Sequence, residues 1–122
     1  MSESELLTRD KIFAKAPEFR RERVEVPQWG GHVYVQQISA KDFEAWQDWI
    51  VKQENAKNPQ SHRAAFIVDC VCDENGKAIF TERSDLNVLG EHQNAVIDLL
   101  YDACKRVNLV DKTALEDAEK NS

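Results

Sequence analysis

The hydrophobic period of the chain changes between residues 22 and 36, and this change constrains the fold more than any other feature. Glu22–Val26 and His32–Gln36 alternate apolar and polar residues, as half-buried β-strands do. Gly30 and Gly31 lie between them and can take the positive φ that a tight reversal often needs. The pattern predicts one small β-hairpin near residues 22–37. Because two strands alone are marginally stable in water, this hairpin has to pack against helices.

The remaining sequence has the period and the capping signals of amphipathic helices. These signals predict helices from Thr8 to about Ala16, Ala40–Glu54 after the cap Ser39, Asp85–Leu89 after the cap Ser84, and about Glu91–Val107, with a final turn from Asp111 or Thr113. The predicted fold class is mainly α, with a minor β part (α+β). It consists of five to six helices packed with the hairpin.

Residues 64–72 admit two interpretations. Asp69 is the only polar residue among them, so the segment is either a helix that is buried on nearly every side or a central strand. Ala64 and Ala65 favour the helix, whereas the β-branched residues Val68 and Val71 favour the strand.

Length and composition indicate one domain that spans residues 1–122, with frayed ends at residues 1–6 and 113–122. Twenty-two acidic against sixteen basic residues give a net charge of −6, which argues against a nucleic-acid partner. The longest apolar run, Ala64–Val68, is far shorter than the ~20 residues that span a bilayer. The acidic N-terminus does not resemble a signal peptide, so we expect a cytoplasmic protein that contacts no membrane.

Groups that could carry out catalysis are sparse. The three cysteines lie on apolar faces, where a thiol acts as a small hydrophobic group, and no cofactor-binding or nucleophile motif is present. A pair between a cysteine and one of the histidines His32, His62 or His92 remains an alternative that an alkylation assay would test. Asp98 and Asp102 are one helical turn apart but lack the further oxygen ligands that calcium needs. We therefore predict no enzyme activity, no metal and no cofactor.

The aromatic residues are better candidates for function, because Trp and Tyr are enriched at binding hot spots. Trp29 lies at the tip of the predicted hairpin, Tyr34 faces outward from its strand, and Trp49 and Tyr101 flank the apolar faces of their helices. These four residues are the candidate partner-binding residues. The alternative is that Trp49 and Tyr101 pack on neighbouring helices and that Trp29 covers its own hairpin.

The order of several motifs resembles a known family. Leu7–Asp10 opens the chain, Val24–Pro27 leads through Trp29–Gly31 into Val33–Val35, and Val68–Gly76 precedes an amphipathic C-terminal helix. This arrangement resembles the tail assembly chaperones of bacteriophages with long flexible tails, which are also found in prophages. The resemblance covers about residues 7–110.

The resemblance implies a non-enzymatic protein that binds the tape measure protein, keeps it soluble and helps the major tail (tube) protein to polymerise around it. It also implies a location in the host cytoplasm, absence from the mature virion, and a longer frameshifted form that shares the N-terminal part. A homo-oligomer is compatible with it. The family supplies no catalytic or binding motif that can be mapped residue by residue. The alternative function is a small acidic helical adaptor or inhibitor that binds a host protein.

Overall fold

The sheet forms where the sequence predicts a hairpin, but it has three strands instead of two. The computed structural model describes residues 4–82 and 84–108. Within it, β1 (Arg21–Val26) pairs antiparallel with β2 (Gly31–Gln36), and β2 pairs antiparallel with the short β3 (Val71–Cys72). The 3-10 turn η1 (Pro27–Trp29) joins the first two strands. Gly30 alone supplies the positive φ, at 70°, whereas Gly31 already belongs to β2.

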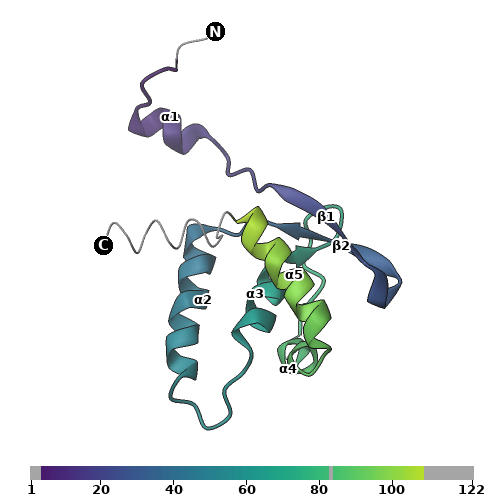
Figure 1. Cartoon of the computed structure of the whole chain (residues 1–122). Helices are drawn as coiled ribbons and strands as arrows, with labels where there is room; N and C mark the ends of the chain where they lie inside the picture. The colour runs from purple at the N-terminus through teal and green to yellow at the C-terminus, as the bar shows by residue number, and fades with distance from the viewer. Residues whose placement is uncertain (1–3, 83, 109–122) are drawn as a thin grey trace, which may run out of the picture.

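The described residues also form five α-helices, which confirms the predicted mainly α class. They are α1 (Arg9–Ala14), α2 (Ala40–Gln53), α3 (His62–Cys70), α4 (Asp85–Gly90) and α5 (Asn94–Val107). α2 to α5 pack together beside the sheet (Figure 1). The predicted caps Thr8 and Ser39 each accept a backbone N–H of the first helical turn, and Ser61 does the same for α3. The final turn expected from Asp111 or Thr113 and the frayed segment 113–122 lie outside the described residues, as do residues 1–3.

Residues 64–72, for which the sequence allowed a helix or a strand, contain both: the end of a helix and a short strand. α3 ends at Cys70, and β3 begins at Val71 without a connecting residue. Val71 pairs with Val35 and Cys72 pairs with Tyr34, so the β-branched end of the segment completes the sheet. The alanines at its other end lie in the helix, as their propensity favours.

One predicted helix start and one predicted cap are wrong in detail. The long C-terminal helix begins at Asn94 instead of Glu91, because the N–H groups of Glu91 and His92 bond back to the end of α4. The chain therefore makes a turn between α4 and α5 before α5 starts. Ser84 precedes α4 but makes no capping hydrogen bond; the carboxylate of Asp85 instead accepts the backbone N–H of Glu82.

The core lies where the apolar faces of α3 and α5 meet the inner face of the sheet. Phe66 is fully buried at its centre; its ring stacks on Trp46 at 4.3 Å between centroids and meets Tyr101 edge-on. The indole N–H of Trp46 donates to the carbonyl of His62 at 2.9 Å, so this buried polar group has a partner. At the edge of the core, Arg106 of α5 forms an ion pair with Glu22 of β1.

The first helix stands apart from this body (Figure 1). No residue between 4 and 20 is buried, although the segment carries several large apolar side chains. Leu6 is 89% exposed and Phe13 is 70% exposed. We call residues 4–20 the N-terminal arm.

Candidate protein-binding surface

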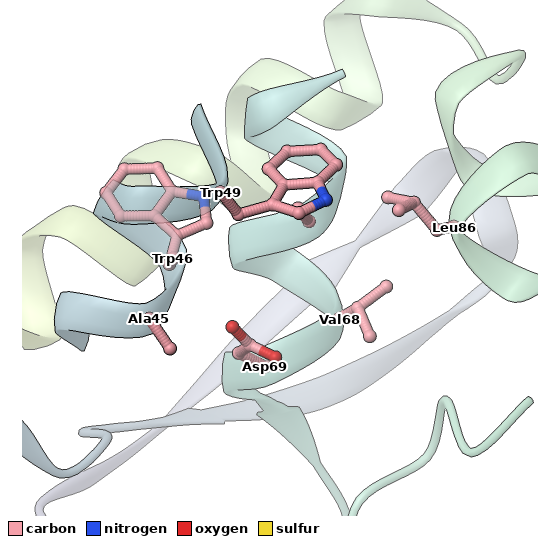
Figure 2. A pocket seen from close by; sticks show the side chains of 7 residues that line it. Ala45, Trp46, Trp49, Val68, Asp69 and Leu86 are labelled. Atoms are coloured by element: carbon pink, nitrogen blue, oxygen red, sulfur yellow. The ribbon is translucent and has the colours of Figure 1, made fainter. Parts of the chain in front are cut away.

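An open pocket of about 270 Å³ lies between α2, α3 and α4. Ala45, Trp46 and Trp49 come from α2; Trp49 follows the other two by three and four residues, the spacing that places side chains on one face of a helix. α3 contributes Ala65, Val68 and Asp69, and α4 contributes Leu86. Figure 2 shows the indole rings of Trp46 and Trp49 in the upper half of the view, with Asp69 below them between Ala45 and Val68. We call this site the helical pocket.

Asp69 is the only acidic side chain that lines the helical pocket. Among the described residues, Asp69 has no ion-pair or side-chain hydrogen-bond partner. Glu22, at the edge of the core, is by contrast paired with Arg106. Desolvation by the surrounding chain raises the pKa of Asp69 to about 6, and the negative charge of Asp42 on α2 acts in the same direction. Its carboxylate keeps contact with solvent at the mouth of the pocket.

Two of the predicted partner-binding residues lie on the helices. Trp49 is half-buried in the wall of the helical pocket. Tyr101 is also half-buried and packs edge-on against His62 and Phe66, with the Lys105 ammonium 4.8 Å from its ring centroid. Burial raises the pKa of the Tyr101 phenol.

The other two predicted residues lie on the hairpin. The indole N–H of Trp29 donates to Nε2 of His92 at 3.1 Å, which links η1 to the turn between α4 and α5. Trp29 is still 36% exposed. Tyr34 is half-buried and packs edge-on against His32, two residues away on the same face of β2. The four predicted residues therefore lie at separate places and do not form one patch.

Asp69 and the small residues of the helical pocket are not among the residues predicted from the sequence. One signal was available for Asp69, because it is the single polar residue of the apolar segment 64–72. Ala45 and Ala65 give no comparable signal, since alanine is common in helices. Leu86 belongs to a different helix, and only the tertiary fold brings it near α2.

The thiols show no sign of activation. Cys70, Cys72 and Cys104 are all buried. A hydrogen bond to Cys70 and burial raise the pKa of Cys104 well above its ordinary value, and burial raises that of Cys72. Each histidine ring instead contacts an aromatic ring: Tyr34, Tyr101 or Trp29.

The carboxylates of α5 are engaged in ion pairs. Asp98 pairs with Arg63 of α3, and Asp102 pairs with Lys105 one turn along its own helix. Within residues 4–82 and 84–108 no three His, Cys, Asp or Glu side chains converge as metal ligands would. None of the described helices is long and apolar enough to cross a membrane.

The comparisons with known proteins identify the family of this chain. The sequence matches the family described as phage tail assembly chaperone over residues 7–121. The fold is similar to the solved structure of the bacteriophage HK97 tail assembly chaperone, with a TM-score of 0.56 and 25% sequence identity. The match covers 79% of this chain and 88% of that chain. No curated protein matches the sequence.

The family match and the similar fold show that the protein is a non-enzymatic assembly factor. The chain belongs to the phage tail assembly chaperone family, and it acts in the morphogenesis of the virion tail. Its partners are accordingly tail proteins.

Proposed function

We propose that this chaperone binds the tape measure protein, keeps it soluble, and promotes polymerisation of the major tail (tube) protein around it. It does so in the host cytoplasm and leaves the assembly before the virion matures. The family assignment supports a tail protein as the partner. A tape measure protein is long and helical and exposes apolar seams, which an amphipathic helical partner can cover.

The observation that carries this proposal is the apolar surface of the N-terminal arm. Large apolar side chains that are 42% to 89% exposed lie along it: Leu6, Leu7, Ile12, Phe13 and Phe19. Contiguous exposed apolar residues on a water-soluble domain are typical of interaction sites. The arm also carries four basic residues among three acidic ones, so it is less acidic than the chain as a whole.

The same arm is compatible with two further partners. A longer frameshifted form would share these N-terminal residues, and a second copy of the chain would present the same surface. We include both in the proposal as chains that assemble with this one along the tape measure protein. Sedimentation of the isolated chaperone would report self-association directly.

The test is co-expression of the tagged chaperone with the tape measure protein encoded by the same phage or prophage. We expect the tape measure protein to become soluble and to co-purify at a fixed ratio. The double substitution Leu7→Asp and Phe13→Asp should abolish capture of the tape measure protein. The control is the double variant Val51→Asp and Val88→Asp, which adds the same two negative charges on α2 and α4, at apolar side chains that are 62% and 68% exposed.

If the tape measure protein stays insoluble and unbound, the proposed function is wrong. Capture of host proteins would then test the alternative of a host-directed adaptor or inhibitor. If the arm variants capture as well as the control, the tape measure protein binds elsewhere on the chaperone.

A further inference from the structure

The helical pocket combines an apolar wall with an acidic end. Trp49, Val68 and Leu86 supply half-buried apolar surface that solvent still reaches. Ala45 and Ala65 have small side chains, so a ligand can approach the backbones of α2 and α3 closely at these positions. This shape suits one apolar side chain projecting from a helix that lies along the groove between α2 and α3.

The charge at the acidic end is not balanced by the protein itself. From α2, Asp42 adds a second negative charge near Asp69. α4 contributes only the apolar Leu86 to the pocket. The cationic and titratable side chains of α3 are engaged elsewhere: Arg63 binds Asp98 and Asn94 of α5, and His62 packs on Tyr101. Asp69 is exposed at the mouth of the pocket with no cation beside it, so a ligand that brings a cation can form a charge-assisted hydrogen bond there.

We propose that the helical pocket binds an amphipathic helix of the partner, which inserts an apolar side chain beside Trp49 and places a lysine or arginine against Asp69. The identity of the partner as a tail protein rests on the proposed function, whereas the chemistry of the ligand rests on the pocket. The site is separate from the N-terminal arm, so the chaperone has two surfaces for its partners.

Two synthetic 18-residue helical peptides are the probes. Both carry the same leucine face; one is flanked by lysines and the other by glutamates. Binding of fluorescently labelled peptide to the full chain is followed by anisotropy at pH 7.5 and physiological ionic strength. We expect the lysine peptide to bind at least about tenfold more tightly than the glutamate peptide, as one charge-assisted contact allows.

Three variants separate the pocket from the general negative charge of the protein. Asp69→Lys should weaken binding of the lysine peptide about tenfold or more. Asp102→Lys makes the same change in net charge on α5, outside the pocket, and should change binding by no more than about twofold. Ala45→Leu fills the pocket from an exposed helix position that tolerates leucine, and it should also weaken binding about tenfold.

The pH dependence provides an independent readout. A bound cation stabilises the charged form of Asp69. The affinity for the lysine peptide is therefore fully present above the pKa of Asp69 in the protein without peptide, which is about 6. Affinity should fall as the pH drops through this value. In Asp69→Asn it should be nearly flat between pH 7.5 and 5.

The proposal is overturned if Asp69→Lys and Asp102→Lys weaken binding equally, or if Ala45→Leu binds as the wild type does. Capture of the tape measure protein is then measured with the same variants. If the peptides use the pocket but the wild type captures no tape measure protein, the proposed function fails and the site stands. If all variants capture it equally, the proposed function stands and the pocket is not its site.

Discussion

At the scale of single residues, Phe66 contributes most to the aromatic core. Its ring contacts those of Trp46, Phe43 and Tyr101, which come from two other helices. We expect Phe66→Ala to lower the free energy of unfolding by about 3–5 kcal/mol, because the cavity cannot close between packed rings. Urea unfolding measures this change. Phe13→Ala in the arm is the control and should stay within about 0.5 kcal/mol.

Asp69 makes the stability depend on pH in an unusual direction for a carboxylate. Its pKa is raised from 3.8 to about 6 in the folded protein, so between these values the folded state binds more protons than the unfolded state. The contribution of Asp69 to stability therefore falls as the pH rises from about 4 to 6. We expect Asp69→Asn to stabilise the protein at pH 7 by up to about 1 kcal/mol, since solvent screens the charge at the pocket mouth.

The same substitution should have no stabilising effect at pH 4, where Asp69 is largely protonated in the folded protein. Thermal melts of both proteins at pH 7 and pH 4 measure the difference. An equal stabilisation at both values would show that the effect does not come from the charge.

At the scale of elements, α1 contributes no buried residue to the core. Because no residue of the N-terminal arm is buried, residues 4–14 contribute no side chain to the core, and a chain that starts at Lys15 keeps every core residue. We expect the free energy of unfolding to change by less than about 0.5 kcal/mol, as measured by urea denaturation. A loss of more than about 1 kcal/mol would mean that the arm packs on the body in solution.

The elements also show how far local sequence determines this fold. Periodicity and caps predict α2 well, since it starts at Ala40 as predicted and ends one residue before the predicted Glu54, and α5 ends at Val107 as predicted. β3 could not be predicted in this way, since its two residues become a strand only by pairing with β2, far away in the sequence. The helical pocket has the same origin, because three helices separated by loops supply its walls.

At the scale of the whole molecule, the three thiols report on global unfolding. Cys70 and Cys104 pack against each other between α3 and α5, and Cys72 is buried on β3. We expect alkylation at neutral pH to be slow, and all three thiols to react together once denaturant opens the core. Mass spectrometry of the products measures this.

Rapid modification of a single thiol under native conditions would contradict that expectation. It would also support the alternative of a catalytic cysteine–histidine pair, which is not expected for a phage tail assembly chaperone.

The direct junction between α3 and β3 limits where the length of this protein can change in evolution. An inserted residue after Cys70 would either rotate α3 by about 100° or turn Val71 and Cys72 to the opposite faces of the sheet. Either outcome removes buried side chains from the core. The exposed connection at residues 55–60 has no such restriction. Insertions and deletions among homologues should therefore accumulate there, while the spacing across the junction stays constant.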